Sequence, residues 1–234
     1  MTFVVITLPN FIFTWLILQY TFVLILLRER FRVLNEALGR ISSAAFVKPY
    51  YFRSSESTLG DVITRNLCLI KESHDDLYEI ACHISSLYSF PIFLVISVFC
   101  ATIIVSAYYF VLALIPAHRV EPFIIFNSMF YIVMEIFPII VLSFGVNKIT
   151  NEMKLTAVAI HKLLTRSSLN AKSKTQLKLF SLELLHKNVS FTGYNIFALD
   201  GTLLHSILNT TATYLIILFQ FGQSNGKPCH DSID

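Results

Sequence analysis

Glu135 is the residue whose chemistry agrees least with its neighbours in the sequence. It is the only charged residue between Pro122 and Asn147, in a stretch that is otherwise uncharged and mostly apolar. In a membrane helix an ionisable side chain is costly at this depth and usually serves a function, such as binding a substrate or an ion. The alternative is a structural role, in which Glu135 forms a hydrogen bond to a neighbouring helix.

A second chemical pattern lies near the C-terminus, where polar and apolar side chains share one face of a predicted helix. Intervals of three or four residues separate Ser206, Thr210, Thr213, Tyr214, Ile217 and Phe221. The first half of this face is polar and the second half is aliphatic and aromatic. Such a face suits a water-filled path that is closed by a hydrophobic constriction. The alternative is a packing face, because Ser and Thr also form hydrogen bonds between membrane helices.

Motifs for enzymatic chemistry are missing from the sequence. It contains no His/Cys cluster with metal-ligand spacing, no P-loop and no nucleophile elbow. The net charge of +3 is too small to indicate nucleic-acid binding. We therefore expect no enzyme activity, no metal or other cofactor and no nucleic-acid partner.

The elements that must position these residues follow from the distribution of charge. Only 14% of the 234 residues are charged, against about 25% in an average soluble domain. A bilayer core needs roughly 20 apolar residues of helix, and four nearly uncharged stretches satisfy this requirement. We predict spans at about 3–27, 90–116, 123–146 and 201–222. The alternative, four helices buried in a large soluble core, is disfavoured because such helices rarely stay uncharged for so long.

The basic residues predict the orientation in the membrane. Loops 28–89 and 147–200 each hold eight of the 18 Lys and Arg residues. The positive-inside rule therefore places both loops in the cytoplasm and both termini outside. An outside N-terminus that begins within a span has no translocated segment before it, so we expect that Met1 is not the biological start and that further helices precede it.

The cytoplasmic loops are predicted to be helical. Apolar residues at helical spacing mark one amphipathic helix, at Ile63, Leu67, Ile70, Leu77, Ile80, Ile84 and Leu87. Ile149, Met153, Val158, Leu163 and Leu164 mark another. Residues 28–47 are expected to continue the first span, 174–186 to form one more helix, and 48–60 to form a loop. The apolar stripes need partners, which predicts a packed helical bundle below the bilayer.

The C-terminal region resembles the signature of insect gustatory receptors. The last span ends Thr213-Tyr214, five apolar residues, then Gln220-Phe221. Phe191-Thr192-Gly193, Phe197, Leu199-Asp200 and the pair Leu203-Leu204 precede it, as in that family. The segment 177–186 is also similar to the family's penultimate cytoplasmic helix, so the specific match covers about 174–221.

The resemblance implies an all-α, seven-span receptor in the plasma membrane, of which the four present spans are the last four. The family forms tetrameric, ligand-gated cation channels, with one or more kinds of subunit, whose last span lines the pore. By this resemblance Ile217 and Phe221 would form rings near the outer gate, Gln220 would be a polar neighbour, and Tyr214 and Thr213 would lie one turn below. The cytoplasmic helices would form the main subunit contact.

The resemblance also implies a pocket for a small-molecule tastant in the outer half of the bundle. The first and third present spans would contribute to it, with Asn10, Trp15, Asn127, Tyr131 and Glu135 as the candidate residues. For Trp15 the alternative, packing against neighbouring side chains, is the favoured one. Membrane lipid is a further expected partner.

Two other functions remain open at this point. A small ion- or proton-coupled transporter would use Glu135 as its ion site, although the sequence has none of the internal symmetry typical of transporters. A truncated, non-functional receptor fragment would have the hydrophobic spans without a complete pocket.

Overall fold

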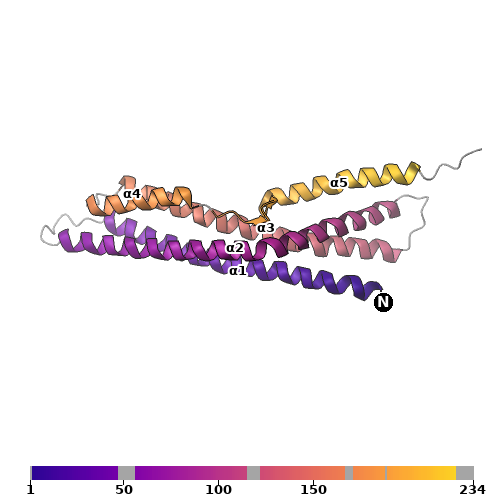
Figure 1. Ribbon diagram of the computed structural model, residues 1–234, viewed down its shortest axis with the longest axis horizontal. Coiled ribbons are helices and arrows are strands. Elements are labelled where there is room, and N and C mark those ends of the chain that lie inside the picture. Colours follow the sequence, from indigo (N-terminus) through magenta and orange to yellow (C-terminus); the bar gives the residue numbers. More distant parts are fainter. Residues whose placement is uncertain (1, 47–55, 115–121, 167–170, 188, 225–234) are drawn as a thin grey trace, which may run out of the picture. The chain divides into compact units, whose positions relative to one another are not determined.

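The computed structural model describes residues 2–46, 56–114, 122–166, 171–187 and 189–224. These residues are almost entirely helical (Figure 1). In chain order the elements are α1 (Thr2–Phe46), α2 (Glu56–Leu114), α3 (Pro122–Arg166), α4 (Ala171–His186), β1 (Thr192–Gly193), β2 (Phe197–Ala198) and α5 (Gly201–Ser224).

The predicted spans 3–27 and 123–146 lie within much longer helices, 201–222 is nearly the whole of α5, and 90–116 falls on α2 except for residues 115–116, which lie outside the described residues. Four helices, α1, α2, α3 and α5, are long and apolar enough to cross a membrane. α1, α2 and α3 have 45, 59 and 45 residues, so each continues without a break from an apolar stretch into a charged one. Pro9, Pro91 and Pro138 lie inside these helices, as membrane helices tolerate. The all-α membrane architecture and the helical continuation of the first span are confirmed.

Two local predictions differ from the structure. The loop expected at 48–60 is too long, because α2 already begins at Glu56; residues 47–55 lie outside the described residues. Residues 189–200, within the loop expected to be helical, are not helical, since β1 and β2 form a short two-stranded sheet there. Two-residue strands leave no periodic pattern in a sequence, so this sheet could not be predicted.

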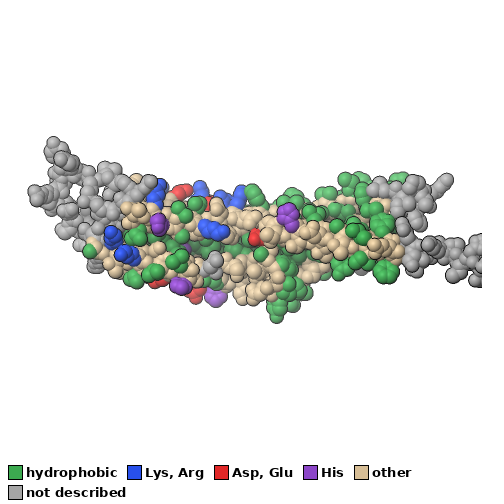
Figure 2. All heavy atoms as spheres, turned by 90° about the horizontal axis from the view of Figure 1, so that it is seen from above, with side chains coloured by type: hydrophobic (Ala, Val, Ile, Leu, Met, Phe, Trp, Pro, Cys, Tyr) green, Lys and Arg blue, Asp and Glu red, His purple; other side chains and the backbone are tan. Residues whose placement is uncertain are grey.

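The chain divides into two compact units, which we describe separately. The charged unit comprises Tyr20–Ser89 and Phe144–Thr192, and the apolar unit comprises Met1–Gln19, Phe90–Ser143 and Gly193–Asp234. On the face drawn in Figure 2, the Lys, Arg, Asp and Glu side chains gather around α4, whereas hydrophobic side chains predominate around α5.

The charged unit is the packed bundle that the amphipathic stripes predict. Its core joins Leu34 and Leu38 of α1, Leu67 of α2, Ile160 and Leu163 of α3, and Leu177 and Phe180 of α4. Within this unit α4 lies along the other three helices (Figure 1). Burial of these side chains supplies the main stabilisation, at about 1.5–3 kcal/mol each.

The predicted stripe of α2 is confirmed as far as Leu77, since Leu67 is in the core and Ile63, Ile70 and Leu77 pack against it, but it is wrong beyond that point. Leu67 and Ala81 are buried, but Ile80 and Leu87 are exposed. His74, one helical repeat from each buried residue, is 2% exposed and takes a core position. Its ring packs edge-on against Phe31 of α1 and Phe180 of α4, with ring centroids 5.8 and 5.4 Å away.

The predicted stripe of α3 is confirmed at Ile149 and Leu163, which are buried, and at Leu164, which packs against the core, but it is wrong at one position. Val158 was expected in the core but is exposed, whereas Thr156 and Ile160 are buried. The Thr156 hydroxyl donates a hydrogen bond of 2.7 Å to the Asn35 side-chain oxygen of α1, and Asn35 donates to the Glu152 backbone oxygen at 2.9 Å. Because the burial of a polar side chain requires such partners, an apolar stripe alone could not predict this contact.

Two ion pairs of opposite polarity join α2 to the end of α4. Lys71 Nζ lies 2.7 Å from Glu183 Oε1, and Lys187 Nζ lies 2.7 Å from Asp75 Oδ1. The hydrogen bond to Glu183 is the main reason why the pKa of Lys71 is raised. Since each helix carries one charge of each sign four residues apart, a shift of register by one turn would bring like charges together.

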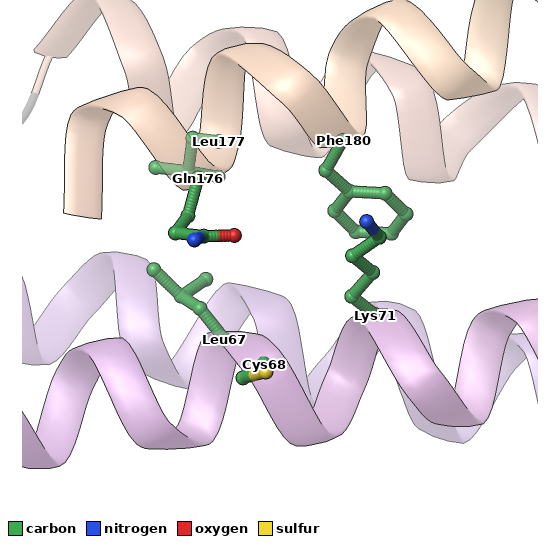
Figure 3. Close-up of a pocket in the computed structure, with 6 residues that line it drawn as sticks. All are labelled: Leu67, Cys68, Lys71, Gln176, Leu177 and Phe180. Carbon is green, nitrogen blue, oxygen red and sulfur yellow. The ribbon is translucent and has the colours of Figure 1, made fainter. Parts of the chain in front are cut away.

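Figure 3 shows how closely α2 and α4 pack. Leu67, Cys68 and Lys71 of α2 face Gln176, Leu177 and Phe180 of α4 around a cavity of about 10 Å³. This volume is at the lower limit for one water molecule. The charged unit therefore offers no room for an organic ligand at this interface.

Candidate functional site

A much larger cavity lies in the apolar unit. Its volume is about 640 Å³, and α1, α2 and α3 each supply part of its wall. Cavities of roughly 300–1,000 Å³ are typical of sites for small organic ligands. On α3 the wall is formed by Asn127, Tyr131 and Glu135, which are four residues apart and share one helix face, and by Ser128.

Four of the five residues predicted to bind a ligand are brought together here. Asn10, Asn127, Tyr131 and Glu135 line the cavity. Trp15 does not line it, and its side chain is 64% exposed. Trp15 is five residues from Asn10 in α1, which places it on a different side of the helix.

Most of the remaining wall comes from α2, whose contribution the sequence analysis missed. Ala101, Thr102, Val105, Ser106 and Tyr109 line the cavity from this helix. They recur at intervals of three or four residues, so they form one face of small and polar side chains. The signal in the sequence is this face within a span that is otherwise rich in large apolar residues.

The two carboxyl oxygens of Glu135 have different surroundings. Its Oε1 atom accepts a hydrogen bond of 3.2 Å from Asn10 Nδ2, which links α3 to α1. Its Oε2 atom is buried and makes no hydrogen bond to the described part of the chain. The residue as a whole is only 1% exposed. Oε1 therefore links two helices, and Oε2 is a buried acceptor without a hydrogen bond in the described part of the chain.

The residues before α5 that resemble the receptor signature form a tight turn. Gly193 O accepts a hydrogen bond of 3.0 Å from Ile196 N, across a turn in which Tyr194 and Asn195 have φ of 50° and 58°. Phe197 folds back over Gly193, where an added Cβ would lie 2.7 Å from the ring. Only glycine fits beneath this ring, which explains the Thr-Gly step of the signature.

Asp200 begins α5 as its N-cap. Its Oδ1 atom accepts a hydrogen bond of 2.9 Å from Thr202 N and another from the Thr202 hydroxyl. These bonds hold the pKa of Asp200 below its usual value. Leu199 beside it is buried, so the Leu-Asp pair of the signature anchors the start of the last helix.

The side chains of the predicted pore face of α5 are exposed in the structure. Thr213, Tyr214, Ile217, Gln220 and Phe221 are all exposed. Phe219, on another side of the helix, packs against Tyr108 of α2 with ring centroids 6.0 Å apart. α5 thus contacts the rest of the apolar unit through one side and leaves its candidate gate residues free.

No part of the described chain gathers three or more His, Cys, Asp or Glu side chains in a way that could hold a metal ion. The cavity lining and the α5 face are therefore the two candidate sites. The first suits ligand binding, and the second suits a surface between subunits or along a pore.

Comparison with known proteins identifies the family. The family model described as "7tm Chemosensory receptor" matches residues 2–225. The chain is 28% identical over 176 residues to the Drosophila melanogaster protein named as gustatory receptor 28b, and 26% identical over 160 residues to the one named 28a. These alignments cover 70% and 65% of this chain but only 37% and 34% of the relatives. The chain thus spans about a third of the length of these relatives.

A solved structure supports the fold. The insect olfactory receptor OR5 from Machilis hrabei, in complex with eugenol, superimposes with a TM-score of 0.63 at 17% sequence identity. The match covers 86% of this chain and 46% of that receptor. The helices described above therefore follow a known receptor fold, and the match to the family model extends over nearly the whole sequence. This chain belongs to the seven-transmembrane chemosensory receptor family, as a multi-pass membrane protein.

Proposed function

We propose that this chain acts in a gustatory receptor subunit, as part of a ligand-gated, non-selective cation channel in the plasma membrane. The observation that carries the proposal is the exposed face of α5, which has hydroxyl side chains in its first half and apolar side chains in its second. Facing an aqueous path, such a helix supplies a hydrated section followed by a hydrophobic gate.

The gate would be formed by four symmetric copies of α5, in a homo- or hetero-tetramer. Ile217 and Phe221 would form two apolar rings, with Gln220 as a polar neighbour and Tyr214 and Thr213 one turn below. A ring of large apolar side chains can empty a narrow pore of water, and rotation of the helices would let water return.

The cavity of the apolar unit would bind the tastant. Its volume of about 640 Å³ and its mixed wall of apolar, amide and hydroxyl side chains are typical of a site for a small organic molecule. Asn10, Asn127, Tyr131 and Glu135 would contact this ligand. A ligand that prefers one arrangement of α1, α2 and α3 would shift the population of open channels.

The charged stretches support an orientation with the loops 28–89 and 147–200 in the cytoplasm and the C-terminus outside. The Lys and Arg residues concentrate in these loops. In this orientation the bundle of the charged unit lies on the cytoplasmic side, where charged side chains meet water.

The test is electrical. In cells that express the chain, Ile217→Ala or Phe221→Ala should raise the ligand-independent cation current several-fold, because a smaller apolar ring no longer excludes water. Ile216→Ala is the matched control, since it makes a similar change about 100° away around the same exposed helix. Surface biotinylation would verify equal amounts of each variant.

Two results would contradict the proposal. One is the absence of any cation current from the parent chain when biotinylation places it at the cell surface. The other is an equal effect of the substitutions at 216, 217 and 221, which would indicate general packing of α5 instead of a gate.

A further inference from the structure

The unpaired oxygen of Glu135 points to the chemistry of the ligand. The side chain is 1% exposed, and Oε2 has no hydrogen-bond donor among the described residues. A buried acceptor left unsatisfied costs about 1–3 kcal/mol, and more when it carries charge. Since Oε1 is already bonded to Asn10, the open position at Oε2 is the natural place for a donor from outside the chain.

The cavity wall offers one hydroxyl beside Glu135, that of Thr102, which interacts with the carboxyl group. This hydroxyl also lies 3.0 Å from the Val98 backbone oxygen and 3.1 Å from that of Phe99, so its single proton is directed to its own helix and leaves Oε2 without a hydrogen bond of good geometry. None of the described lining residues is Lys, Arg or His, and Glu135 is the only carboxylate. The wall therefore offers one acidic group and no basic group to balance it.

The rest of the wall suits the apolar body of a cationic ligand. Tyr109 and Tyr131 place two aromatic side chains at the cavity, and Ala101 and Val105 add aliphatic surface. Aromatic faces attract organic cations, with a larger effect where water is excluded. An anionic ligand would be repelled by an ionised Glu135, and a neutral ligand would leave this buried carboxyl group to be neutralised by a proton, whereas a cation stabilises its charged form.

We infer that the cavity selects small organic amines, whose ammonium group donates a hydrogen bond to Glu135 Oε2 while the apolar body lies against Tyr109, Tyr131 and Val105. This inference rests on the proposed ligand site but not on channel activity. The pairing of ammonium and carboxylate is a charge-assisted hydrogen bond, which is roughly twice as strong as a neutral one.

The first measurement compares two probes of nearly equal shape. The complete chain in lipid nanodiscs is titrated with tritiated 3-phenylpropylamine, and 3-phenylpropan-1-ol is used as the competitor. The amine should bind at least about tenfold more tightly than the alcohol, because only the amine forms the charged pair. Equal affinities of the parent chain for the two probes would overturn the inference without any variant being made.

The second measurement uses Glu135→Gln, which keeps the shape of the side chain and an oxygen for Asn10 but removes the charge. Amine affinity should fall at least about tenfold, while alcohol affinity should stay within about twofold. The control is Glu79→Gln, which removes the same charge from an exposed position in α2. An amine affinity that is equal in Glu135→Gln and the parent would overturn the inference.

Current recordings with the same probes separate this inference from the proposed function. Amine-selective binding without any current would support the amine site and contradict the channel. Currents evoked equally by the alcohol and the amine would support the channel and contradict the amine site.

Discussion

The two units both contain segments of α1, α2 and α3, but they differ in how densely their side chains pack. In the charged unit, α2 and α4 close around a cavity of about 10 Å³, whereas in the apolar unit α1, α2 and α3 surround about 640 Å³. The helices are continuous through both units, so helix geometry does not cause the difference. The side chains do: Leu67, Leu177 and Phe180 fill one interface, and Thr102 and Ser106 leave the other open.

This difference teaches that a hollow in a helical membrane protein can be encoded by a short run of small residues. Large apolar side chains, packed to the density of a crystal, leave little free volume. A face of Ala, Thr, Val and Ser within a helix does not reach its neighbours, and a polar wall makes the remaining space suitable for water or a ligand. The comparison can be tested by making the same kind of change in each unit.

The largest expected effect is the loss of the Phe180 side chain from the charged unit. Phe180 is buried and contacts the core of all four helices there as well as the ring of His74. Phe180→Ala should lower the free energy of unfolding by about 3–5 kcal/mol, because it removes apolar contacts and leaves a cavity. Chemical unfolding in detergent micelles, followed by circular dichroism, measures this change.

The control for Phe180→Ala is Leu185→Ala on the same helix. Leu185 is 76% exposed, so its truncation should change the free energy of unfolding by less than about 0.5 kcal/mol. Similar losses for both variants would mean that the bundle does not depend on the packed interface between α2 and α4.

The next effect compares one substitution in both units. Ser173 in α4 is buried, and its hydroxyl lies 2.6 Å from that of Thr64 in α2. Ser173→Leu should cost about 1–3 kcal/mol through overpacking, in addition to the lost hydrogen bond. Ser106→Leu adds the same bulk to the large cavity, so it should change stability little and weaken binding of the amine probe at least about tenfold by occupying the site.

Ser→Ala at positions 106 and 173 is the matched control, because it removes the hydroxyl without adding bulk. Unfolding and probe binding are measured for all four variants. The contrast between the units fails if Ser106→Leu destabilises the protein as much as Ser173→Leu does, or if it leaves probe binding unchanged.

The sequence predicts the helices better than the faces that they bury. Uncharged stretches and amphipathic spacing depend on many residues, so the spans and their helical continuations were predictable. The buried stripe of α2 was predictable only in its first half, where Ile63, Leu67, Ile70 and Leu77 join the core. Beyond it, Ile80 and Leu87 fit a helical stripe but are exposed, because apolar side chains also face outward in a membrane protein. His74 takes a core position that a search for apolar residues skips.

The candidate site was predictable in part for a similar reason. Glu135 is conspicuous in an uncharged span. Asn127 and Tyr131 were suggested only by the pocket that the family resemblance implies, and they share a helix face with Glu135. Thr102 and Ser106 are ordinary residues for a membrane helix, and only the structure brings them to the cavity. Trp15, the largest side chain, suggested a contact with ligand, but its place on α1 points it elsewhere.

The smallest expected effect is a pH dependence that comes from the charged unit alone. Burial lowers the pKa of His74 below 6.5, and the nearby Lys187 adds to this, while Asp75 and Glu183 oppose it. His74 Nδ1 is 3.7 Å from Asp75 Oδ1, which is too far for a hydrogen bond. The folded protein therefore binds the proton more weakly than the unfolded chain does.

The sign of the effect follows from this difference. Above pH 6.5 both states leave His74 neutral, and stability does not depend on it. As the pH falls through 6.5, the unfolded chain gains a proton that the folded protein resists, so stability decreases until the pH passes below the folded pKa.

His74→Leu should remove this part of the pH dependence, and His83→Leu, at an exposed position in α2, should not. Unfolding curves between pH 5 and 8 would measure it, and identical pH dependence in the parent and His74→Leu would mean that the buried imidazole does not resist protonation. None of the described residues that line the cavity of the apolar unit is His, so filling that cavity with Ser106→Leu should leave this pH dependence intact.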